Sequence, residues 1–178
     1  MKEMILLLLL LLMQTGGLLA QNAGYPESPD GVVSEYLRLD AEGAELSKEG
    51  RASLQRLNPN NVEINYSRTM NTSVISGYKI LQTKLKGDKG TVMVEYEVIG
   101  IATDYFFDFN PRAKKEKVEI LLSRIDGSWR VETNIWPHMS AEAVAQHFEE
   151  IASTARKPEH FKAVAQRIRE MAKQPSKH

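Results

Sequence analysis

Apolar and polar residues alternate on both sides of Asp126-Gly127, and this alternation predicts a β-hairpin. Asp-Gly readily adopts the positive φ angles of a two-residue type I′ turn, which fixes the register of the flanking strands. In that register four pairs share one mostly apolar face: Leu122 with Val131, Arg124 with Trp129, Ile120 with Thr133, and Val118 with Ile135. Three mostly polar pairs share the other face: Ser123 with Arg130, Leu121 with Glu132, and Glu119 with Asn134. Because turn and pattern agree, we expect one buried and one exposed side.

Two further strands are expected before this hairpin, at 77–85 and 91–108. A loop of three or four residues within 86–90 joins them, and a short strand at 62–66 precedes them. Val92, Val94, Tyr96 and Val98 point one way in the second strand, where Gly100 suggests a bulge or a sharp bend. We interpret NPRAKK at 110–115 as the connection into the Asp126-Gly127 hairpin, which we call the organising hairpin.

Four segments carry helix signals. The first opens at Ser28-Pro29-Asp30, because serine can cap a helix, proline suits its first position and aspartate suits the positive end of its dipole. Its apolar stripe of Val33, Tyr36 and Leu37 ends at Asp40, and Gly43 can terminate it. The other helices are expected to begin at Ser47, Ser140 and Pro158.

The last helix has a clean amphipathic pattern, with a charged face opposite an apolar one. The apolar face carries Phe161, Val164, Ala165, Ile168 and Met171. Binding of this face to a membrane surface is one interpretation. We favour docking on the domain's own core, because most helical stability comes from packing an apolar face.

The N-terminus has the layout of a secretory signal peptide. A short polar start precedes the unbroken apolar run Met4–Met13, and small residues follow it. The run is shorter than the roughly 20 residues that span a bilayer. We expect cleavage after Ala20, or alternatively after Gly17, and therefore a secreted or periplasmic protein. An uncleaved membrane anchor is the competing interpretation.

The expected organisation follows from these segments. It comprises a signal peptide (1–20), a disordered lead-in (21–28), one folded domain (29–138), C-terminal helices (139–173) and a tail (174–178).

Composition excludes several function classes. The 178-residue chain has 23 Lys and Arg against 23 Asp and Glu, so no global field attracts nucleic acid or an anionic membrane. Cysteine is absent, which rules out disulfides and thiolate chemistry. The four histidines do not follow metal-site spacing, so no metal or other cofactor is expected: His138, His147, His160 and His178. Asn65 and Asn71 fit the N-glycosylation pattern, which also arises often by chance.

Three stretches together resemble the nuclear-transport-factor-2-like (NTF2-like, or cystatin-like) superfamily: GVVSEYLRLDAEGAEL, TVMVEYEVIGIATDYFFDF and VEILLSRIDGSWRVETNIWPH. The resemblance covers roughly 29–138. It implies an α+β fold in which N-terminal helices pack on a strongly curved antiparallel sheet, the cone, with additional C-terminal helices here. Ketosteroid isomerases, polyketide cyclases and many exported domains of no known activity share that cone, so the fold does not determine the function.

Our leading hypothesis is a non-catalytic domain that binds a small apolar ligand or an exported protein partner. Tyr36, Tyr96 and Trp129 are the predicted pocket residues. In this hypothesis Asp40 is a mostly solvated carboxylate with a near-normal pKa.

Two alternatives stay open. One is an enzyme of the isomerase or cyclase type, with Asp40 as the base and a tyrosine that holds an oxyanion. The candidate tyrosines are Tyr36, Tyr66 and Tyr96, and Asp104 is the other candidate acid. The second alternative is a homodimer that pairs through the outer sheet face, where we expect three exposed residues: Ile99, Ile101 and Leu121.

Overall fold

The computed structural model describes residues 26–60, 71–103 and 108–174. The predicted signal peptide, the strand at 62–66 with Asn65 and Tyr66, and the candidate acid Asp104 lie outside these residues. In the part of the chain that is described, no helix is long and apolar enough to cross a membrane.

The N-terminal helices begin where the sequence predicts, and the first ends before Gly43 as expected. Helix α2 spans Pro29–Ala41, and the hydroxyl of Ser28 accepts the Gly31 N–H at 3.1 Å. Gly43 has a φ of 76° and leads into a short 3-10 helix, η1 (Ala44–Leu46). Helix α3 spans Lys48–Leu57, and Ser47 caps it by accepting the Gly50 N–H at 3.0 Å.

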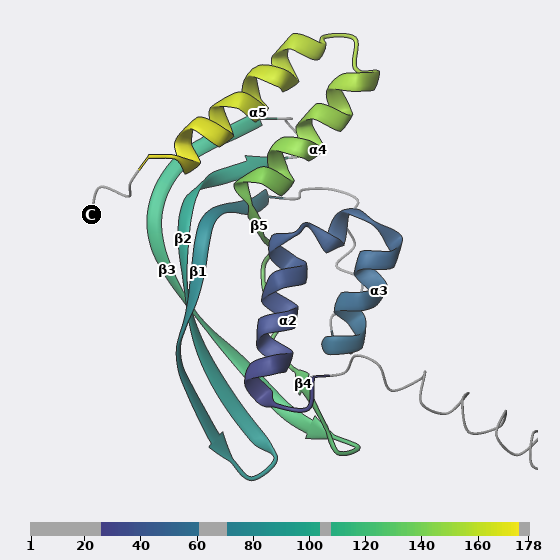
Figure 1. Cartoon of the computed structure of the whole chain (residues 1–178), viewed down its shortest axis with the longest axis vertical. Coiled ribbons are helices and arrows are strands. Elements are labelled where there is room, and N and C mark those ends of the chain that lie inside the picture. Colours follow the sequence, from purple (N-terminus) through teal and green to yellow (C-terminus); the bar gives the residue numbers. More distant parts are fainter. Residues whose placement is uncertain (1–25, 61–70, 104–107, 175–178) are drawn as a thin grey trace, which may run out of the picture.

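Five strands form one curled sheet in the order β4-β3-β2-β1-β5. They are β1 (Asn71–Lys86), β2 (Lys89–Thr103), β3 (Asp108–Ile125), β4 (Ser128–Val131) and β5 (His138–Ser140). Figure 1 shows the three long strands bending together around the side that faces α2 and α3. Strand β5 pairs with β1 in parallel, so the sheet is mixed and not wholly antiparallel as expected.

The organising hairpin is confirmed at its turn. Asp126 and Gly127 have φ angles of 49° and 80°, as a type I′ turn requires. Two of the expected apolar-face pairs form, Leu122 with Val131 and Arg124 with Trp129.

The two pairs further from the turn do not form, because β4 ends at Val131. The hydroxyl of Thr133 accepts the Leu121 N–H at 2.7 Å and so replaces the next backbone bond of the ladder. The chain then leaves β3 and crosses to the opposite edge of the sheet, where β5 joins β1. The expected pairing of Ile120 with Thr133 and of Val118 with Ile135 is therefore wrong.

The strand boundaries before the hairpin also differ from those expected. Strand β1 begins at Asn71, and Gly87-Asp88 connects β1 to β2 as a two-residue turn, shorter than the loop we expected. The segment 110–115 belongs to β3 and is not a connection. Pro111 is tolerated there because it lies opposite Gly100, beside a shift in the β2–β3 register.

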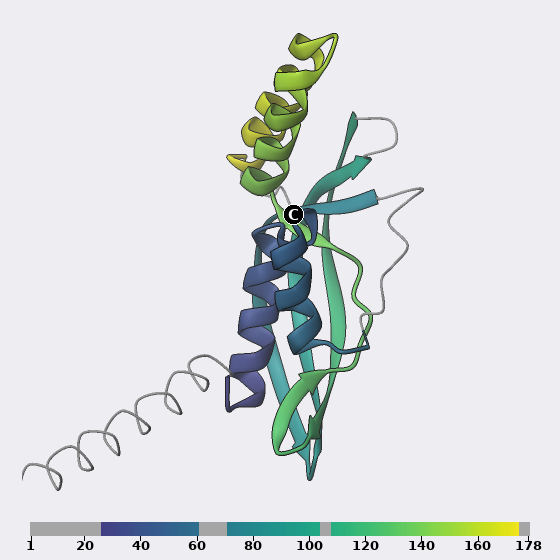
Figure 2. The ribbon, with the colours of Figure 1, turned by 90° about the vertical axis from the view of Figure 1, so that its right-hand side faces the viewer.

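The fold has two apolar cores. In the first, α2 and α3 cover the concave face of the sheet (Figure 2), and its fully buried members include Val33, Leu37, Val94, Ile120 and Leu122. In the second, α4 (Ala141–Thr154) and α5 (Pro158–Ala172) pack on one end of the sheet through residues such as Val74, Phe109, Phe148 and Ile168. The apolar face of α5 thus docks on the chain's own core, as predicted.

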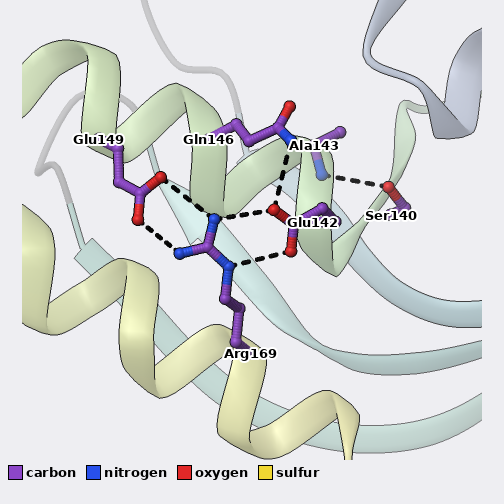
Figure 3. A network of polar contacts seen from close by, with 6 residues as sticks. All are labelled: Ser140, Glu142, Ala143, Gln146, Glu149 and Arg169. Carbon is purple, nitrogen blue, oxygen red and sulfur yellow. Dashed lines mark hydrogen bonds and ion pairs between the residues drawn. The ribbon is translucent and has the colours of Figure 1, made fainter.

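Arg169 of α5 forms ion pairs with two glutamates of α4. Its guanidinium donates to both oxygens of Glu142, at 2.9 and 2.8 Å, and also to Glu149 (Figure 3). Ser140 caps α4, as the sequence predicts, by accepting the Ala143 N–H at 3.2 Å. This second helical unit buries Ile99, which we expected on an exposed outer face, while Leu121 is exposed as expected.

Candidate functional site

The structure places the three predicted pocket residues inward and corrects the prediction for Asp40. Tyr36 and Tyr96 are 1% exposed, and Trp129 is also buried. Asp40 is 2% exposed, so the expectation of a mostly solvated carboxylate is wrong. Asp40 continues the stripe of α2 that faces the sheet, and the start of β5 closes over it.

These residues do not all lie in the same part of the structure. Tyr96 lies opposite Glu116 of β3, whereas Trp129 lies opposite Arg124. Those two β3 positions are eight residues apart (124 − 116), or roughly 26 Å along a strand. Trp129 is therefore a core residue of the hairpin end, and the candidate site forms around Asp40 and Tyr96.

His138, which sequence reasoning considered only as a metal ligand, completes this site. Its backbone N–H donates to Oδ2 of Asp40 at 3.1 Å. Its imidazole stacks on the ring of Tyr96, with centroids 3.8 Å apart and planes inclined by 10° (relative to each other). Its Nε2 lies 3.9 Å from Oε1 of Glu116. We call Tyr36, Asp40, Glu45, Tyr96, Glu116 and His138 the buried polar cluster.

Several polar atoms of the buried polar cluster have no hydrogen-bond partner among the described residues. These are the Tyr96 hydroxyl and both ring nitrogens of His138. The half-buried carboxylate of Glu116 pairs with Nζ of Lys114 at 2.5 Å. The carbonyl of Trp136 acts on the same imidazole, but outside good hydrogen-bond geometry. Buried polar atoms are nearly always paired in folded proteins, so this concentration calls for an explanation.

Burial sets the protonation of the buried polar cluster. It raises the pKa of the Asp40 carboxyl well above its usual value, and the nearby Glu45 carboxylate acts in the same direction, while the hydrogen bond from His138 opposes both. Burial also raises the pKa of the Tyr36 and Tyr96 phenols. It lowers the pKa of His138, against the attraction of Glu116.

Within this cluster Tyr36, Tyr96 and His138 are therefore neutral at neutral pH, and the carboxyl of Asp40 is shifted toward its acid form. Such groups can donate hydrogen bonds to a carbonyl or hydroxyl oxygen, and they can exchange a proton with it. The described residues contain no group of three or more His, Asp or Glu side chains placed to hold a metal ion.

Comparison of the chain with family models, with curated proteins and with solved structures gives no match.

Proposed function

We propose that this chain is an exported, non-catalytic domain of the NTF2-like cone type that binds a small, mostly apolar ligand at the buried polar cluster. One observation carries the proposal. The hydroxyl of Tyr96 and the ring nitrogens of His138 are buried without partners on the helix-covered side of the curled sheet.

The energetics favour a ligand with one polar end. Each buried, unpaired polar group costs roughly 1–3 kcal/mol, which a ligand oxygen or hydroxyl at that place would recover. The surroundings are apolar, since Tyr96 belongs to the same core as Val94, Val98 and Leu37. A ligand that combines an apolar body with a single carbonyl or hydroxyl fits both features.

Entry to the cluster requires a covering segment to move, because its aromatic members are about as buried as the core. The segment between β4 and β5, 132–137, leads directly into His138. Two hydrogen bonds hold this segment in place. The side-chain amide of Asn58 donates to the Thr133 carbonyl at 2.8 Å, and the Ser73 N–H donates to the Pro137 carbonyl at 3.0 Å. Its Trp136 is 49% exposed.

The test is a calorimetric and thermal-shift screen of small hydrophobic alcohols and ketones. A ligand found in this way should bind Tyr96→Phe about tenfold more weakly, equivalent to about 1.4 kcal/mol, because one hydrogen bond is lost. The substitution removes an unpaired hydroxyl, so the free protein should keep its stability. Tyr78→Phe is the matched control, since that ring lies 6.2 Å from Tyr96 and is 37% exposed. Unchanged affinity in Tyr96→Phe would refute this site.

A second candidate function is an acid–base enzyme of the isomerase or cyclase type. The raised pKa of Asp40 beside Tyr96 favours it, because catalytic carboxyls are often tuned upward by burial. Turnover of a ketosteroid-like substrate by the wild type, and its loss in Asp40→Asn, would replace the binding proposal with this one.

Export rests on the predicted signal peptide. Mass spectrometry of the protein from its native host should give an N-terminus near Gln21. A cytosolic protein with an intact Met1 would contradict it.

A further inference from the structure

The imidazole of His138 faces two hydrogen-bond acceptors inside the buried polar cluster. Its Nε2 lies 3.9 Å from Oε1 of Glu116, and the backbone carbonyl of Trp136 acts on the same ring. Neither contact reaches hydrogen-bond geometry, so both ring nitrogens are buried without a partner among the described residues. The side chain of His138 is 1% exposed, which keeps bulk water from serving either nitrogen.

A neutral imidazole can satisfy only one of these two acceptors. It carries a single N–H, and its other nitrogen is an acceptor that needs a donor. Burial lowers the pKa of His138 against the attraction of Glu116, whose carboxylate is already paired with Lys114 at 2.5 Å. The ring therefore stays neutral, and one nitrogen keeps a buried lone pair, whichever of the two holds the proton.

The hydroxyl of Tyr96 supplies the complementary half of the site. The Tyr96 ring stacks on the imidazole with centroids 3.8 Å apart and planes inclined by 10°, so its hydroxyl and the imidazole edge lie close together. This hydroxyl is also buried without a partner in the described part of the chain, and it can donate as well as accept. A ligand hydroxyl can accept from Tyr96 and donate to His138 through one oxygen, whereas a carbonyl oxygen can only accept.

We propose that the buried polar cluster selects an alcohol over a ketone of the same carbon skeleton. This selectivity rests on the proposed ligand site and narrows its ligand to a molecule with a hydroxyl group. A ketone would leave the lone pair of His138 buried and unpaired, and a site built to hydrogen-bond a hydroxyl rejects an analogue without it for that reason. One unmet bond of this kind corresponds to about tenfold in affinity.

The test compares borneol with camphor, which share one bicyclic skeleton and differ in carrying a hydroxyl or a carbonyl group. Calorimetry of the full mature chain at neutral pH should give borneol an affinity about tenfold higher than that of camphor. His138→Phe keeps an aromatic ring against Tyr96 and the backbone N–H that donates to Asp40, but it removes the ring nitrogens. This variant should bind the two compounds equally. His147→Phe makes the same exchange on α4 and should keep the tenfold preference.

The variant Tyr96→Phe separates the ligand site from its selectivity. It should weaken borneol and camphor to the same extent, because both accept a hydrogen bond from the Tyr96 hydroxyl. Failure of both compounds to bind, or unchanged affinities in Tyr96→Phe, would overturn the ligand site and the selectivity with it. Equal affinity for the two compounds in the wild type, with weaker binding of both in Tyr96→Phe, would keep the ligand site and overturn the selectivity alone. A preference for borneol that persists in His138→Phe would also overturn it.

Nitrogen NMR of His138 in the wild type reports the same interaction without a variant that has to fold. The free protein at neutral pH should show one protonated and one unprotonated ring nitrogen, as a neutral imidazole requires. Borneol should shift the resonance of the unprotonated nitrogen, because a donor then reaches its lone pair, and camphor should leave that resonance in place. Two protonated ring nitrogens in the free protein, or an unprotonated nitrogen that borneol does not shift, would overturn the proposal.

Discussion

Replacing Asp40 by asparagine should change how the stability of this protein depends on pH. The asparagine side chain keeps an oxygen that can accept the His138 N–H, a bond of 3.1 Å in the wild type. It puts an NH₂ group where protonated Asp40 has its OH, so it mimics the neutral acid at every pH. The substitution thus removes one titration from the interior while it preserves shape and hydrogen bonding.

The direction of this pH dependence of stability follows from the raised pKa of Asp40. In the unfolded chain this carboxyl titrates near its ordinary value of 3.8, and in the fold well above it. The folded state therefore binds the proton more tightly, and the resulting stability is fully present below pH 3.8 and is lost as pH rises through the folded pKa. Each unit of elevation corresponds to about 1.4 kcal/mol. We expect the wild type to lose stability relative to Asp40→Asn as pH rises, by that amount for each unit of elevation.

The assay is urea unfolding of both proteins at several pH values between 4.5 and 9. The informative quantity is the difference in unfolding free energy between the two proteins, because every other titratable group, His138 included, is the same in both. Glu119→Gln, which changes an exposed carboxylate, should run parallel to the wild type. If the Asp40→Asn curve also ran parallel, or fell faster toward high pH, the assignment of a buried, proton-retaining Asp40 would be wrong.

Three further predictions test the fold. Leu122→Ala should destabilise by roughly 2–5 kcal/mol in urea melts, because the side chain is 1% exposed, whereas Glu119→Ala on the other face should stay within about 0.5 kcal/mol; similar losses would contradict the hairpin register. Gly100→Ala should destabilise by roughly 1–3 kcal/mol or more, since its Cβ would lie within 2.4 Å of the Phe109 ring and 2.6 Å of the Asn110 carbonyl. Gly77→Ala is the control and should be nearly neutral, because a Cβ there would have no atom within 4 Å. Arg169→Lys should lower the melting temperature slightly, because lysine lacks the planar fork that reaches Glu142 and Glu149, and high salt should abolish the difference; a deficit that persists in high salt would point to lost packing instead.

Local chemistry was enough to predict where three helices begin and where the hairpin turns. Ser28, Ser47 and Ser140 each cap the helix that they were expected to begin. Asp126-Gly127 set the hairpin register correctly as far as Val131. Each of these signals depends only on residues close together in the sequence, so it can be recognised from the sequence alone.

The errors arose where distant segments decide the outcome. NPRAKK looked like a connection because proline and lysine are rare inside strands, but Pro111 sits beside a register shift opposite Gly100. A Cβ at Gly100 would also collide with Phe109, which shows that the glycine makes room for this neighbouring strand. Neither fact is visible until β2 and β3 are paired.

The candidate site depends on the same kind of information. Asp40 comes from the end of α2, Tyr96 from the middle of β2 and His138 from the first residue of β5. The hydrophobic stripe of α2 hinted at Asp40, and strand alternation placed Tyr96 inward. His138 carried no such signal, because it follows a crossover that had been interpreted as the continuation of β4. Once Thr133 interrupts that ladder, the chain carries His138 to the other edge of the sheet, where its backbone binds Asp40 and its ring covers Tyr96. The residue that completes the site is therefore positioned by the end of the hairpin that organises the fold.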